Sequence, residues 1–123
     1  MSFSLLIIDD DEDIQLILAS VLAPIEGLNL RQASSGLEAR KILNTQIIDG
    51  VILDYRLPDM NGAKLLQEIQ DTHFSQQPRV LMLSALDDAD LKTKWIHMGA
   101  LAVLKKPFNP FDLLAELRDH FDF

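Results

Sequence analysis

Short apolar segments alternate strictly with segments whose apolar residues recur at helical spacing, and this alternation is the strongest constraint on the fold. The apolar segments are predicted to be strands over residues 3–8, 28–33, 47–53, 79–83 and 101–104. Runs rich in β-branched and leucine side chains are typical of strands that a parallel sheet buries on both faces. Strict alternation with short connections predicts one doubly wound α/β sheet covered by helices, and we expect a single domain over 1–123.

The segments between these strands carry signals for helix ends. Asp11 or Asp13 is placed to cap the first helix, and Asn109 followed by Pro110 predicts the start of the last one. The remaining helices are expected near residues 37–45, 61–72 and 87–98, and a polar connection over 75–78. The buried face of the last helix is predicted to carry Phe111, Leu114, Leu117 and Phe121.

Composition is that of a soluble globular protein and excludes several kinds of site. Hydrophobic residues make up 48% of the 123 residues and charged residues 24%. The chain has no cysteine, which excludes disulfides, thiolate metal sites and a cysteine nucleophile. No apolar run approaches the roughly 20 residues of a membrane-spanning helix, and the first residues lack the pattern of a signal peptide. We therefore expect a cytoplasmic protein that does not engage a membrane.

The net charge of −8, from 19 acidic and 11 basic residues, bears on the choice of partner. Non-specific nucleic-acid binding needs basic surface that neutralises phosphates, so we expect no direct nucleic-acid partner. The charge suits a divalent cation or a basic protein, although an acidic surface also serves solubility alone.

Polar side chains follow four of the predicted strands at the point where each strand ends. Asp9 and Asp10 follow the first strand, Asp54 the third, Ser84 the fourth and Lys106 the fifth. In a flavodoxin-like sheet, with five parallel strands in the order 2-1-3-4-5, the first and third strands are neighbours at the switch point. The three carboxylates would then converge in one cleft at the carboxyl edge of the sheet.

This set of residue types indicates phosphoryl chemistry. Carboxylates that lie so close share a proton or bind a cation, and Mg²⁺ prefers oxygen ligands while keeping several waters. Ser84 supplies a hydrogen-bond donor and Lys106 a positive charge for phosphoryl oxygens, which leaves Asp54 as the nucleophile. Each residue taken singly is more often a solvated loop residue, and it is their joint placement that favours a site.

The sequence resembles the receiver domains of two-component response regulators, including chemotaxis regulators, over essentially its whole length. The motifs that carry the resemblance are Ile7-Ile8-Asp9-Asp10, the run Leu53 to Gly62, Leu83-Ser84-Ala85, Gly99-Ala100 and Lys106-Pro107-Phe108. The resemblance implies that Asp54 accepts phosphoryl from a histidine kinase. It also implies that Mg²⁺ is held by Asp10, Asp54 and the main-chain carbonyl of Arg56, with Asp9 contributing largely through water.

The resemblance further implies how the signal leaves the site. Ser84 and Lys106 would contact the phosphoryl oxygens and pass the switch to a face formed by the helix over 87–98, the strand over 101–104 and the last helix. That face would bind an output protein or domain, or a second copy of the chain. The input partner would be a histidine kinase or a phosphotransfer protein, and the chain would be a self-phosphorylating and autodephosphorylating switch rather than a turnover enzyme.

Several positions depart from the family pattern. Val103 lies three positions before Lys106, where the family usually has an aromatic residue. The rotamer change of that aromatic ring, which is coupled to the hydroxyl of the site, therefore cannot operate in its usual form. Leu101 and Ala102 stand where acids are common. Trp95 is expected to pack in the core, with an apolar output face used for dimerisation as the alternative. The side chain of Arg56 is expected to be exposed and to tune the access of water to a phosphorylated Asp54.

Two other functions fit parts of the pattern. A Mg²⁺-dependent phosphohydrolase of the haloacid-dehalogenase type also joins acids, a hydroxyl and a lysine at strand ends, with Asp9 as nucleophile. The length leaves no room for a cap domain, which disfavours this reading. A phosphorylation-independent pseudo-receiver is disfavoured because every phosphorylation residue is present. The histidines His73, His97 and His120 follow no ligand spacing and are expected to take no catalytic part.

Overall fold

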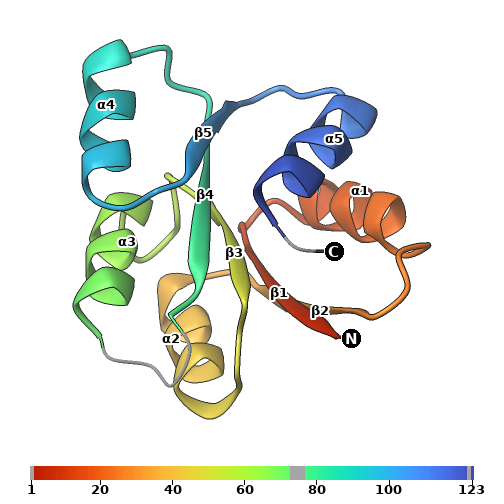
Figure 1. Ribbon diagram of the computed structural model, residues 1–123. Helices are drawn as coiled ribbons and strands as arrows, with labels where there is room; N and C mark the ends of the chain where they lie inside the picture. Colours follow the sequence, from red (N-terminus) through yellow and green to blue (C-terminus); the bar gives the residue numbers. More distant parts are fainter. Residues whose placement is uncertain (1, 73–76, 122) are drawn as a thin grey trace.

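The computed structural model describes residues 2–72, 77–121 and 123 and shows a parallel sheet between two layers of helices (Figure 1). The strands are β1 (Phe3–Ile8), β2 (Leu28–Ala33), β3 (Gly50–Asp54), β4 (Arg79–Ser84) and β5 (Ala102–Lys105). The helices are α1 (Glu12–Leu22), α2 (Gly36–Thr45), α3 (Gly62–Asp71), α4 (Ala89–His97) and α5 (Pro110–His120). The sheet order is β2-β1-β3-β4-β5, which confirms the predicted flavodoxin-like architecture.

Alternate residues of β1 point to opposite faces of the sheet and contribute to two separate cores. Leu6 and Ile8 pack with residues of α2, α3 and α4, whereas Leu5 and Ile7 pack with residues of α1 and α5. Figure 1 shows the same division, with α1 beside α5 on one face of the sheet. Because helices cover both faces, every residue of β3 is buried, which explains why this strand reads as a continuous apolar run.

The helices α1 and α5 begin at side-chain caps that the sequence predicted. Of the two candidates for α1, Asp11 is the cap, and its carboxylate accepts from the backbone N–H groups of Asp13 and Ile14. Asn109 caps α5 with Pro110 at the first helical position, as predicted. Gly99 follows α4 with φ of 112°, a left-handed conformation that favours glycine.

The central strand begins later than predicted. Strand pairing starts where Gly50 lies opposite Leu5 of β1, and Ile47 is exposed before it. Asp49, directly before β3, is hydrogen-bonded to β1. Its carboxylate accepts from the N–H of Ser4, and its own N–H donates to the Ser4 carbonyl. The fifth strand is also displaced by one residue and leaves Leu101 exposed before it.

The prediction that Phe111 lies on the buried face of α5 is wrong, because its side chain is 79% exposed. With Asn109 as the cap, the helical phase places Leu113 and Leu117 against the sheet, four residues apart on one face. Phe121 continues that face and is buried, as predicted. Residue 111 lies two positions before Leu113 and therefore projects from the opposite side of the helix.

Two further observations complete the fold. No helix in the described ranges is both long enough and apolar enough to span a bilayer. Of the predicted polar connection, Ser75 and Gln76 lie outside the described residues, as does His73.

Candidate functional site

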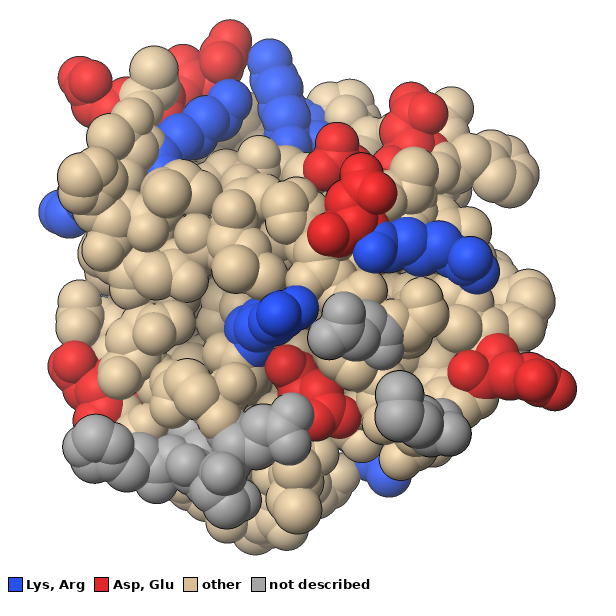
Figure 2. All heavy atoms as spheres, in the orientation of Figure 1, with Lys and Arg blue, Asp and Glu red and all other residues tan. Residues whose placement is uncertain are grey.

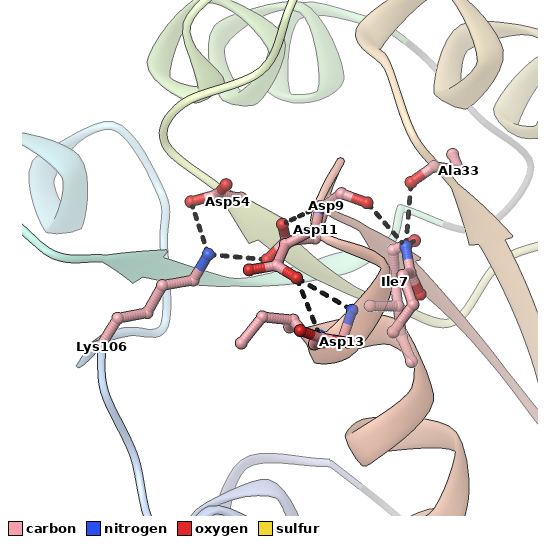
Figure 3. Close-up of polar contacts among 9 residues, drawn as sticks. Ile7, Asp9, Asp11, Asp13, Ala33, Asp54 and Lys106 are labelled. Carbon is pink, nitrogen blue, oxygen red and sulfur yellow. Dashed lines mark hydrogen bonds and ion pairs between the residues drawn. The ribbon is translucent and has the colours of Figure 1, made fainter.

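The parallel register brings the predicted site residues to one edge of the sheet. Ile8 of β1 pairs with Leu53 of β3, so Asp9 and Asp54 leave neighbouring strands at the same level. Asp54 pairs with Leu83 of β4, and Ser84 pairs with Lys105 of β5. The strand ends therefore present the acids, the hydroxyl and the following lysine along a single rim, and Figure 3 shows Asp9, Asp54 and Lys106 of this set.

Asp9, Asp10 and Asp54 form an acidic cluster at this rim. Each offers a carboxylate oxygen, and these oxygens all lie within 4.8 Å of one another. Asp9 is fully buried and Asp54 is buried, whereas Asp10 faces solvent. The N–H of Asp11 donates to Asp9 Oδ1 at 2.9 Å and orients that carboxylate. Two buried acids and one exposed acid suit a hard cation that keeps some of its water.

Lys106 reaches between two of the three carboxylates (Figure 3). Its Nζ lies 2.8 Å from Asp9 Oδ2 and 3.3 Å from Asp54 Oδ1. Burial lowers the pKa of the amine, but the hydrogen bond with Asp9 and the charges of Asp54 and Asp9 together raise it above its ordinary value. The lysine therefore stays charged and holds the two carboxylates together.

The surroundings of Asp54 disfavour the charged form of its carboxyl group. Burial and then the negative charge of Asp9 raise its pKa, and the net value is about 6. Lys106 and the backbone N–H of Arg56 lower the pKa but do not cancel these two effects. A second cation at the rim would favour the charged form of Asp54.

Ser84 ends β4 beside this cluster and is buried. Its hydroxyl oxygen accepts from the N–H of Leu86 at 3.0 Å, and its carbonyl accepts from the N–H of Lys106 at 2.9 Å. The hydroxyl uses only an acceptor position here, so its hydrogen remains available for an oxygen atom in the site. Ser84 thus lies where the sequence predicted it.

The loop after β3 folds tightly against the end of that strand. The Gly62 N–H donates to the Tyr55 carbonyl at 2.5 Å, and Arg56 pairs with Asn61 in an antiparallel bridge. A Cβ atom at position 62 would overlap the Asp54 carbonyl oxygen, so this close approach requires glycine. The side chain of Arg56 is exposed, as expected.

Two residues at the site were not anticipated from the sequence. The amide nitrogen Nε2 of Gln15, on α1, is directed at the carbonyls of Ile7, Asp9 and Ala33 at 3.0–3.1 Å. The carboxylate of Asp59, in the loop after β3, accepts from backbone N–H groups at the start of α2. A glutamine or aspartate of this kind carries no pattern in the sequence, because its partners are backbone groups of other elements.

Trp95 packs in the core, which confirms the favoured expectation. Its side chain is 1% exposed and packs at a tilt against the ring of Tyr55. The alternative, in which Trp95 belonged to an exposed face, is therefore wrong. Val103 is partly buried and packs against the hydrophobic core that contains Trp95. The histidines His97 and His120 lie at the ends of α4 and α5 that are far from the rim.

Comparison with known proteins agrees with this fold. The family model of the response regulator receiver domain matches residues 5–118. The chain therefore belongs to the receiver-domain family of two-component response regulators.

Its curated relatives are regulators. The chain is 33% identical over 118 residues to Regulatory protein VanRc of Enterococcus gallinarum, covering 96% of this chain and 49% of that protein. It is 38% identical to the probable transcriptional regulator ycf27 of Cyanidium caldarium, with 93% and 44% covered. Transcriptional regulatory protein CpxR of Escherichia coli K12 is 33% identical, with 93% and 47% covered. The chain thus spans about half the length of the curated relatives it matches.

Solved structures show the same architecture. A putative response regulator from Chloroflexus aurantiacus is 31% identical, with a TM-score of 0.85 and 97% of each chain covered. The chemotaxis response regulator CheY4 of Vibrio cholerae is 26% identical, with a TM-score of 0.87 and 97% and 98% covered. The BeF3-activated DrrB receiver domain is 26% identical, with a TM-score of 0.83 and 97% of each chain covered.

Proposed function

We propose that this domain is a phosphoacceptor and that Asp54 takes a phosphoryl group from the phosphohistidine of a histidine kinase or phosphotransfer protein. The observation that carries the proposal is the position of Asp54 at the end of the central strand. Its carboxylate lies 3.3 Å from the Lys106 amine and within reach of a cation that Asp9 and Asp10 would share. A buried carboxylate with a charged amine on one side and two acids on the other suits phosphoryl transfer.

The acidic cluster fits Mg²⁺ in its chemistry. Asp10 and Asp54 would bind the ion directly together with the main-chain carbonyl of Arg56, and Asp9 would contribute largely through water. Burial raises the pKa of Asp54, and the negative charge of Asp9 adds to this effect, so a cation shared by the two carboxylates would favour the charged form of Asp54. When bound, Mg²⁺ supplies charge stabilisation for the phosphoryl oxygens.

The residues of the chain would share the transfer step. A carboxylate oxygen of Asp54 attacks phosphorus, the P–N bond to the donor imidazole breaks, and the imidazole nitrogen keeps the electron pair. Ser84 would donate its hydroxyl hydrogen to one phosphoryl oxygen, and Lys106 would leave Asp54 to bind another. Attack by water later releases inorganic phosphate and restores the carboxylate. The exposed Arg56 side chain would tune the access of that water.

The output surface that we propose is the face of α4, β5 and α5. In Figure 1, β5 lies between α4 and α5, and Figure 2 shows, in the same view, charged side chains at the upper end of this region and a largely uncharged area below them. Large apolar side chains are exposed along these elements, namely Ile96, Leu101 and Phe111. The partner would be an output protein or domain, or a second copy of the chain in a homodimer. We also propose a cytoplasmic location, without direct contact to nucleic acid or membrane.

The two other functions are not favoured. In a phosphohydrolase, Asp9 would be the nucleophile, but both its carboxylate oxygens are engaged, one by Lys106 and one by the Asp11 N–H. The curated relatives are regulators rather than turnover enzymes. A pseudo-receiver would not need the lysine, the hydroxyl and the acids together at one rim.

Incubation with Mg²⁺ and acetyl phosphate tests the proposal. The intact mass of the wild type should rise by one phosphoryl group, and the Asp54→Asn variant should stay unchanged. Beryllofluoride with Mg²⁺ should change the Trp95 fluorescence of the wild type only. A mass increase that persists in Asp54→Asn, or none in the wild type, would reject the proposal.

A further inference from the structure

Asp59 connects the loop after β3 to the start of α2. Its Oδ1 accepts from the Gly36 N–H and its Oδ2 from the Leu37 N–H, each at 2.9 Å. Ser35, the local cap, accepts from the Glu38 N–H. The first N–H groups of a helix have no partners inside the helix and carry partial positive charge. Asp59 therefore completes the cap of α2 from a distant segment, and these hydrogen bonds lower the pKa of its carboxyl.

The same loop is closed by its own backbone. Leu57 donates its N–H to the Met60 carbonyl at 3.2 Å, inside the bridge between Arg56 and Asn61. Asp59 lies at the tip of this turn, and Met60 beside it packs against Gly36, where a Cβ would overlap its sulfur. The tip of the loop thus has one charged and one apolar contact with the same end of α2.

The helix that receives Asp59 is itself held in place. Arg40 on α2 forms a two-point ion pair with Glu68 on α3, from Nε to Oε2 and from Nη2 to Oε1. The loop leads directly into α3 through Gly62. The helix that Asp59 contacts and the helix that follows its loop are therefore fixed to each other. The hydrogen bonds of Asp59 thus restrict the position of the loop.

We propose that Asp59 is a positioning residue, which holds the loop of residues 56–61 so that the backbone of Arg56 is ordered for a cation at the acidic cluster. This inference rests on the proposed function, because it takes that cation to be Mg²⁺. Arg56 already directs its backbone N–H to the Asp54 carboxylate. The carbonyl of the same residue is the proposed ligand, so the conformation of the loop determines the positions of both the N–H and the carbonyl of Arg56. Groups that orient a metal ligand without touching the metal strongly affect affinity.

The experiment compares three variants by Mg²⁺ titration calorimetry. Asp59→Ala should bind Mg²⁺ roughly tenfold more weakly than the wild type, at the lower end of the range for such supporting groups. Ser35→Ala is the matched control, because it removes a cap from the same end of α2 without touching the loop. It should lose thermal stability but keep its Mg²⁺ affinity. Asp59→Asn removes the charge yet keeps an acceptor oxygen, so it should recover part of the affinity.

Amide hydrogen exchange gives a second readout that does not need the metal. The Leu57 N–H should exchange faster in Asp59→Ala than in the wild type or Ser35→Ala. Equal affinity and exchange in the wild type and Asp59→Ala would overturn this inference alone. Equal losses in Asp59→Asn and Asp59→Ala would also overturn it, because the effect would then be one of charge. Absence of Mg²⁺ binding by the wild type would overturn the inference together with the proposed function.

Discussion

The indole of Trp95 packs against the phenol ring of Tyr55 in a tilted arrangement, with ring centroids 4.7 Å apart and an angle of 33° between the planes. Tyr55 directly follows Asp54, and Trp95 belongs to α4. The pair thus joins the residue after the proposed phosphoacceptor to a helix of the proposed output face. Val103 is partly buried and packs against the same hydrophobic core.

Trp95 emission is therefore expected to report the state of Asp54. Beryllofluoride with Mg²⁺ should change its intensity, because any shift of Tyr55 alters the ring that covers the indole. Tyr55→Leu keeps an apolar side chain but removes the stack. It should still bind beryllofluoride while losing most of the fluorescence response. A response of the same size in Tyr55→Leu would show that the signal does not depend on this contact.

The Asp54→Asn substitution should stabilise the metal-free protein at neutral pH. The folded pKa of about 6 exceeds the ordinary 3.8, so the folded state binds a proton more tightly than the unfolded state. This residue therefore lowers stability progressively as pH rises from about 4 to 6, and the loss persists above that. The variant should gain on the order of 2 kcal/mol at pH 7.5 in EDTA and nothing near pH 3.5.

Urea denaturation of both proteins at the two pH values measures this difference. Adding Mg²⁺ should narrow it at pH 7.5, because the ion stabilises the charged carboxylate of the wild type. A variant less stable than the wild type in EDTA at pH 7.5 would contradict the raised pKa.

Loss of Lys106 should destabilise the protein strongly. Lys106→Ala leaves the fully buried Asp9 and the buried Asp54 facing each other without a cation, at a cost of about 3 kcal/mol in EDTA. Mg²⁺ should restore more stability to this variant than to the wild type. The control is Lys105→Ala, whose exposed pair with Asp87 contributes less than about 1 kcal/mol. Thermal unfolding with and without Mg²⁺ would refute this account if the two variants behaved alike.

Two glycines give a further comparison of backbone and side-chain contacts. Gly62→Ala places a methyl group on the Asp54 carbonyl, which cannot move without disturbing the site, and should cost about 3 kcal/mol. Gly36→Ala meets first the flexible side chain of Met60, which can move, and should cost about 1 kcal/mol. Chemical denaturation measures both values. A larger loss for Gly36→Ala would contradict the packing described for this loop.

The sheet and the rim were predictable because they depend on local patterns. Buried strands read as apolar runs, and each run ends abruptly at the residue that reaches the rim, as Leu53 gives way to Asp54. Strict alternation of strands and helices then limits the order in which the strands pair. Phe111 shows where the pattern failed, since its face depends on the helical phase set by Leu113 and Leu117.

The contacts within the site depend on packing between distant segments. Lys106 and Asp9 are 97 positions apart, and the sequence placed both at the rim without showing that they pair. Asp59 and Gly36 are 23 positions apart and meet only because α2 packs beside the loop after β3. A carboxylate that binds backbone N–H groups selects no partner side chain, so no sequence pattern marks the pair.

The most direct test of the central claim is the position of the acyl phosphate. After reaction with Mg²⁺ and acetyl phosphate, borohydride reduction traps a phosphorylated aspartate, and peptide mass spectrometry identifies the residue. The structure predicts that Asp54 is the trapped residue and that EDTA prevents the reaction. Trapping at Asp9, or no trapping at any aspartate, would contradict the account.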